Sequence, residues 1–70
     1  MPTLTLRGDH ITLAQALKAA GFAGSGGQAK HLVRSGTVKV NDAEAIQPGR
    51  KLVVGDRFRV GADDEWVIGK

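Results

Sequence analysis

The stretch SGGQAKHLVRSGTVKVN, residues 25–41, changes its periodicity midway and so decides the fold. Ser25 precedes Gln28 by three residues, which is the spacing of a capping box at the start of a helix. Apolar residues then recur at helical spacing, at Ala29, Leu32 and Val33. Gly36 ends this pattern, and the residues after it alternate polar and apolar side chains. We therefore predict a helix that ends at Gly36 and is followed directly by a strand, with Val38 and Val40 on its buried face.

The residues before this stretch repeat the same helical pattern. Thr12 and Gln15 have the spacing of another capping box, so a helix should begin at Leu13. Its apolar face is predicted to consist of Leu13, Ala16, Leu17 and Ala20. Gly21 is placed to end this helix in a left-handed conformation. Residues 3–6 alternate polar and apolar side chains and predict a short strand ahead of the two helices.

The residues after the stretch read as short strands and turns. Turns are expected at Asn41-Asp42, Pro48-Gly49 and Gly55-Asp56. Further short strands or apolar pieces are expected at residues 44–46, 51–54, 57–60 and 65–68. The order predicts an α+β fold, with two short helices packed on a small, mostly antiparallel sheet. We expect residues 1–70 to form one domain.

Composition limits the possible functions. The chain has 70 residues, no cysteine and a net charge of +3. Residues 1–51 carry a net +4 and residues 52–70 a net −1, so an anion-binding surface is expected in the first part. The lack of cysteine excludes disulfides, thiolate metal sites and thiol nucleophiles. Apolar runs are short and no signal-peptide pattern is present, so we expect a cytoplasmic protein without a membrane span.

Side chains suited to catalysis or metal binding are few. His10 and His31 are the only histidines, and the capping position of Ser25 explains its hydroxyl without a nucleophilic role. The acidic residues 63–65 are adjacent and would point in different directions, which is typical of a solvated turn rather than a cation site. We therefore expect no enzyme activity, no cofactor, no metal and no small-molecule substrate.

A basic helix face is the strongest functional signal from composition and spacing. Lys30 and Arg34 are four residues apart and share a face, opposite the apolar stripe. Two cations alone are more often a solvated face than a binding site. Three further cations could extend the patch if the sheet packs suitably: Lys39, Arg50 and Lys51. Together they predict a surface that follows phosphates.

The glycine-rich start of the second helix and the few aromatic residues indicate how a nucleic acid would be bound. Residues 24–27 lack the spacing of a nucleotide P-loop, but their backbone N–H groups could accept one phosphate of a polyanion. Phe22, Phe58 and Trp66 are the only aromatic residues, and all three fit the core or its edge. Stacking on unpaired bases needs exposed rings, so structured RNA is favoured over single strands.

From Ile11 to Phe58 the chain resembles the S4 RNA-binding domain. The similarity lies in four ordered motifs: Leu13, Leu17, Lys18 and Gly21, then residues 25–30, 36–41 and 49–56. The chain length is similar to that of short bacterial stand-alone S4 proteins. Many members have Arg after the capping Ser, where this chain has Gly26, and Arg-Leu-Asp where it has residues 11–13. A weaker phosphate contact at the first helical turn is therefore expected.

The resemblance implies an αL-type fold whose second helix and following hairpin form the RNA surface. Carried over by position, the RNA-binding residues would be Ser25, Gly26, Gln28, Lys30, His31, Arg34, Lys39 and Asn41, with Arg50 and Lys51 at a basic turn. The implied partner is a structured ribosomal or transfer RNA, with the ribosome as a further partner, bound by a monomer.

Two other functions are compatible with parts of the sequence. A β-grasp carrier or protein-interaction module would share the turns at residues 40–42 and 54–56. However, a sulfur carrier needs a terminal Gly-Gly, whereas this chain ends in Val-Ile-Gly-Lys, and two consecutive helices fit that fold poorly. The other option is an S4 scaffold that makes only protein contacts on the ribosome.

Overall fold

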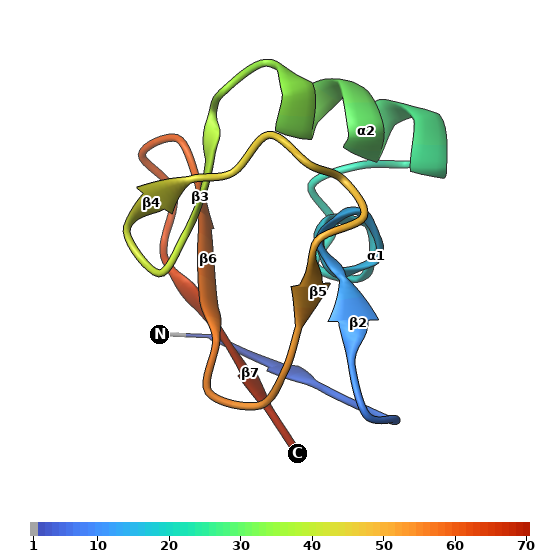
Figure 1. Ribbon diagram of the computed structural model, residues 1–70, viewed down its shortest axis with the longest axis vertical. Coiled ribbons are helices and arrows are strands. Elements are labelled where there is room, and N and C mark those ends of the chain that lie inside the picture. Colours follow the sequence, from blue (N-terminus) through green and yellow to red (C-terminus); the bar gives the residue numbers. More distant parts are fainter. Residues whose placement is uncertain (1) are drawn as a thin grey trace.

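The computed structural model describes residues 2–70 (Figure 1). The two helices are α1 (Leu13–Ala19) and α2 (Gly26–Arg34). The strands are β1 (Thr3–Thr5), β2 (Ile11–Thr12), β3 (Val38–Val40), β4 (Ala43–Glu44), β5 (Lys51–Leu52), β6 (Arg57–Val60) and β7 (Trp66–Gly69). Within this described part, neither helix has the length and apolar character needed to cross a membrane.

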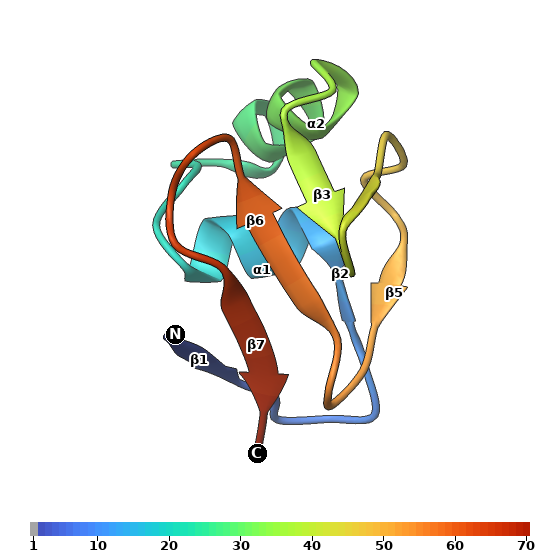
Figure 2. The same ribbon diagram turned by 90° about the vertical axis from the view of Figure 1, so that its left-hand side faces the viewer.

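Five strands form one sheet in the order β1-β7-β6-β3-β4, and β2 and β5 form a separate antiparallel pair. Neighbours in the larger sheet are antiparallel except β1 and β7, which run parallel. Figures 1 and 2 show both helices on the same side of this sheet, with α2 at the end far from β1. The predicted α+β class, with two helices on a mostly antiparallel sheet, is confirmed.

The core fills the space between the helices and the inner face of the sheet. Its fully buried side chains include Leu13, Leu17, Val33, Val38, Val40, Leu52, Phe58 and Ile68. The alternation predicted for β3 is confirmed, because Val38 and Val40 are buried while Lys39 between them is exposed. Leu32 and Ala20, expected among the apolar faces of the helices, are half-buried at the edge of the core.

The capping box predicted for α1 is present in full. The Thr12 hydroxyl accepts from the Gln15 backbone N–H at 3.2 Å, and the Gln15 side-chain oxygen accepts from the Thr12 N–H at 3.1 Å. Two of the N–H groups that a helix start leaves without a helical partner are thus satisfied. In addition, the Leu13 N–H donates to the carbonyl of Arg50, which fixes residues 48–50 to the start of α1.

Only one of the two hydrogen bonds of the capping box predicted for α2 is present. Ser25 caps as expected, with its hydroxyl accepting from the Gln28 N–H at 3.2 Å. The Gln28 side chain does not return to Ser25; its oxygen accepts from the Gly24 N–H at 2.7 Å. The tight bend at residues 22–24 places the Gly24 amide closer to this oxygen. Gln28 therefore ties the interhelical loop to α2.

Replacing Thr12 by alanine should lower the free energy of unfolding by about 1 kcal/mol, because the first turn of α1 loses its cap acceptor. Urea denaturation followed by circular dichroism measures this change. Thr12→Ser keeps the hydroxyl and should stay close to the wild type. Equal destabilisation by both variants would mean that packing of the Thr12 methyl group, rather than the cap, is responsible.

Glycines end both helices as predicted. Gly21 and Gly36 have φ values of +88° and +84°, a backbone region that favours glycine. The turn after β3 also has positive φ at both central residues, Asn41 (+51°) and Asp42 (+68°), as a two-residue hairpin with a type I′ turn requires.

Several strand boundaries differ from the prediction. The return strand expected at residues 44–46 is β4, Ala43–Glu44, because the two-residue turn starts the pairing one residue earlier. The piece expected at 51–54 pairs only at Lys51 and Leu52, and the last strand lies at 66–69 rather than 65–68. The strand β2 was missed, since two residues are too few to show a period; it pairs with β5 far along the chain.

Candidate nucleic-acid interface

Helix α2 exposes a basic flank that its buried residues define. Ala29 and Val33 are fully buried, whereas Lys30 and Arg34 are exposed. At 100° per residue, this pair lies on one flank of the helix and Leu32 on the other. Leu32 and His31 line a groove with Phe22, so they face the side of the helix occupied by the aromatic residues. Lys30 and Arg34 therefore lie on the opposite side.

The segment of residues 45–50 runs past α2 on this opposite side, away from the loop of residues 61–65 (Figure 2). Its course is fixed by backbone bonds from Leu13 to the Arg50 carbonyl (2.8 Å) and from Ala14 to the Pro48 carbonyl (3.0 Å). The side chains of Arg50 and Lys51 are exposed. The backbone that leads into the basic turn thus runs on the side of α2 that carries Lys30 and Arg34, although the two segments are far apart in sequence.

The first turn of α2 is open. Ser25, Gly26 and Gln28 are exposed, and a Cβ built on Gly26 would meet no atom within 4 Å. The Ser25 hydroxyl and the Gln28 oxygen are already used as acceptors within the chain. What this turn offers to a ligand is therefore backbone N–H groups and the positive end of the helix dipole.

Lys39 lies on a different surface from the α2 flank. It is exposed on the face of the sheet that the helices leave open, opposite Glu44 on β4 and Arg59 on β6. Arg59 is a cation that the sequence analysis did not place in the patch. The alternation of residues 57–60 already contained this signal, because burial of Phe58 and Val60 turns Arg57 and Arg59 outward.

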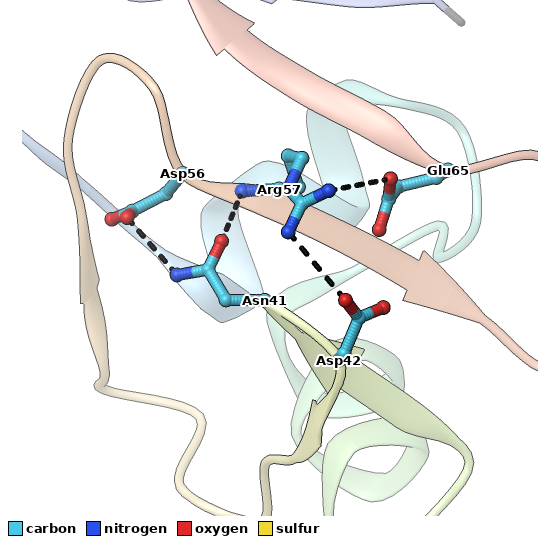
Figure 3. A network of polar contacts seen from close by, with 5 residues as sticks. All are labelled: Asn41, Asp42, Asp56, Arg57 and Glu65. Atoms are coloured by element: carbon cyan, nitrogen blue, oxygen red, sulfur yellow. Dashed lines mark hydrogen bonds and ion pairs between the residues drawn. The ribbon is translucent and has the colours of Figure 1, made fainter.

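Asn41 is held within the chain by both polar atoms of its side chain (Figure 3). Its Oδ1 accepts from the Arg57 N–H at 3.0 Å, and its Nδ2 donates to Asp56 at 3.2 Å. Asp56 in turn accepts from the Val53 N–H at 2.9 Å. Asn41 therefore ties the hairpin turn to the start of β6 and the turn before it.

Replacing Asn41 by glycine should lower the free energy of unfolding by about 1 kcal/mol, because two exposed hydrogen bonds are lost while positive φ remains easy. Asp42→Gly is the matched control, since it removes only a surface ion pair and should change stability by less than about 0.5 kcal/mol. Urea denaturation of both variants tests this. If Asn41→Gly is as stable as the wild type, the amide is free to serve a ligand.

Ion pairs are confined to the open face of the sheet. Within residues 2–70 the two salt bridges both involve Arg57, which pairs with Asp42 and Glu65 at 3.5 Å each (Figure 3). The five predicted cations Lys30, Arg34, Lys39, Arg50 and Lys51 make none in this part of the chain. Residues 25–41 and 45–55 contain no Asp or Glu at all. The α2 flank and the basic turn therefore make no ion pair within the described residues, although Glu44 lines a hollow together with Arg50.

The acidic residues 63–65 do not assemble a cation site. In the described residues no group of three or more His, Asp or Glu side chains could hold a metal ion, and Glu65 instead faces Arg57. The exposed cations and the backbone N–H groups at the start of α2 are donors suited to phosphate groups.

Two known proteins and one family model are similar to this chain. The protein named "Probable ribosome maturation protein RlbA" from Bacillus subtilis is 48% identical over 48 residues, covering 69% of this chain and 68% of that protein. The tyrosine–tRNA ligase of Novosphingobium aromaticivorans is 35% identical over 57 residues, which cover 81% of this chain. The chain spans only 14% of the length of that ligase. A family model described as the S4 domain matches residues 4–68, and the chain belongs to the S4 domain family.

Proposed function

We propose that this chain binds structured RNA and has no catalytic activity of its own. The proposal rests mainly on Lys30 and Arg34. Both side chains are exposed on one flank of α2, a helix that begins with two glycines, and neither pairs with a carboxylate in the described residues. The segment of residues 45–50 runs past this side of α2, so Arg50 and the following Lys51 would extend the contact along a phosphate backbone. Such contacts provide affinity and fix orientation without reading sequence.

Backbone and shape recognition is favoured over base stacking by the aromatic residues. Trp66 lies 6.2 Å from Phe58 in a stacked arrangement and 6.2 Å from Phe22 edge-on, measured between ring centroids. Phe58 is fully buried, and the rings of Trp66 and Phe22 are half-buried and packed against the core. Rings packed in this way cannot form a platform for unpaired bases.

The proposed RNA is ribosomal or transfer RNA in the cytoplasm, bound by a monomer. The names of the two relatives support this, since one refers to ribosome maturation and the other to a tRNA ligase. Among the residues carried over from the family, Ser25, Gly26 and Gln28 would contribute the open helix start, and His31 would border it. Asn41 would act indirectly, by holding the hairpin in place. A β-grasp carrier is not supported, because the chain belongs to the S4 family.

Binding to purified ribosomal RNA and to bulk tRNA, measured against salt concentration, tests the proposal. Each neutralised phosphate adds about 0.7–0.9 to the log–log slope, so four cations predict a slope near −3. An unpaired oligouridine strand should bind more weakly than either folded RNA. Absence of binding at low salt, or a slope near zero, would refute RNA binding and leave protein contact on the ribosome as the better explanation.

A further inference from the structure

The strand β1 has an unpaired edge. It is the terminal strand of the five-stranded sheet and pairs only with β7. The Val67 N–H donates to the Pro2 carbonyl at 3.0 Å, and the Leu6 N–H donates to the Gly69 carbonyl at 2.6 Å. In a parallel ladder, alternate residues bond to the same neighbour, so the N–H and C=O groups of Thr3 and Thr5 point away from β7. None of the other hydrogen bonds in the described residues uses them.

A groove lies beside this edge. Residues 4–8 form one wall, and Ile11, Gln15 and Ala19 from β2 and α1 form the other, around a volume of about 730 Å³. Leu4, Leu6 and Ile11 supply apolar surface. Arg7 and His10 also line the groove, and no carboxylate does.

These features define what could occupy the groove. The unpaired backbone N–H and C=O groups of β1 can form hydrogen bonds with the backbone of another extended segment. Every second side chain of that added segment would then pack against the apolar walls of the groove. The arginine without a facing carboxylate favours an acidic residue in the ligand. A nucleic acid fits less well, because the groove has one Arg and no Lys, whereas the α2 side carries four cations of these types.

A second copy of the chain is a poorer occupant than a peptide. A stable dimer buries about 800 Å² on each partner, which is nearly a fifth of the 4217 Å² surface of this chain. An edge of three residues, Thr3–Thr5, supplies only a small part of that area.

We propose that the free edge of β1 and its groove bind an extended acidic segment of a protein partner by strand addition. The site lies at the end of the molecule away from α2 (Figure 1), so RNA and peptide could be bound together. The proposal does not depend on RNA binding. It would make the chain an adaptor between an RNA and a protein.

Amide NMR and hydrogen exchange with a chosen probe test the site. The probe is an amidated peptide of alternating valine and threonine with glutamate at both ends, EVTVTVE, and its control is KVTVTVK. With the acidic peptide at millimolar concentration, the Thr3 and Thr5 amides should exchange at least about tenfold more slowly, while Leu4 and Leu6 remain protected throughout. The lysine peptide should bind more weakly.

Two variants separate strand addition from other contacts. Thr5→Pro removes an N–H that points to solvent and leaves the bonds to β7 intact, so the chain should fold but bind the peptide at least about tenfold more weakly. Arg7→Glu changes an exposed side chain and should reverse the preference, so that the lysine peptide binds more tightly.

Four results would overturn the proposal. These are an absence of amide changes with the acidic peptide, unchanged binding by both variants, protection of Thr3 and Thr5 that rises with protein concentration alone, and protection of the same amides by RNA. The third result would assign the edge to a second copy, and the fourth would assign it to the nucleic acid. Loss of RNA binding alone would leave the peptide site standing.

Discussion

Replacing Lys30 and Arg34 together by glutamine is expected to weaken binding to folded RNA about tenfold to a hundredfold near 0.1 M salt, because two phosphate contacts are lost. The log–log salt slope should fall by about 1.4–1.8. Both side chains are exposed and make no ion pair within the described residues, so the unfolding free energy should change by less than about 0.5 kcal/mol. Fluorescence anisotropy with labelled tRNA, together with thermal melting, measures both quantities.

A second double variant with the same loss of charge shows whether RNA binds at the α2 flank or is attracted by the net charge of the chain. Arg7→Gln with Lys70→Gln removes the same charge from the opposite end of the molecule, where both residues are exposed. This pair should lower affinity much less, since its phosphates would lie beyond the Debye length of about 10 Å at 0.1 M salt. Equal losses in the two double variants would mean that net charge, and not the α2 flank, drives binding.

Replacing Phe58 by alanine is expected to unfold most of the chain at room temperature. Phe58 is fully buried at the centre of β6 and stacks on Trp66. Removal of a buried phenylalanine costs about 3–5 kcal/mol. The hydrophobic core of a chain as short as 70 residues rarely supplies more than about 3–5 kcal/mol of stability, so this loss removes most of it. Circular dichroism and the amide NMR spectrum should show loss of fixed structure.

The conservative substitution Phe58→Leu keeps most of the apolar volume and should restore a cooperative transition at a lower midpoint. Arg59→Gln, on the next residue and on the outer face, should leave stability nearly unchanged. If Phe58→Ala melts at the wild-type temperature, the stacked contact with Trp66 contributes little and the core must be held mainly by the helices.

Much of the fold followed from local patterns. The sequence correctly predicted the N-terminal caps of the helices at residues 12 and 25 and the glycines that end them at residues 21 and 36. It also predicted which side of β3 is buried. Each is set by neighbours within four residues, through capping bonds, backbone sterics or strand alternation. The capping partner of Gln28 was wrong, because it depends on how the interhelical loop bends and not on spacing alone.

The candidate site shows the same division. Lys30 and Arg34 share a flank because helical geometry fixes their angle, and this could be inferred directly. The sequence alone could not show whether Lys39 lies with them, because the answer depends on which face of the sheet the helices cover. The structure places Lys39 on the open face, beside Arg59.

The sequence by itself thus determined the α+β class, the order of the elements apart from β2, and the basic flank of α2, whose own residues include no carboxylate. Only the tertiary structure decided which distant segments meet. Residues 45–50 run beside α2, the Asn41 side chain accepts a hydrogen bond from the backbone of β6, and β2 pairs with β5. The tertiary structure alone also left the edge of β1 open beside a groove. The reason is physical: helix and turn patterns are local, whereas strand partners and free edges result from packing the whole chain around one core.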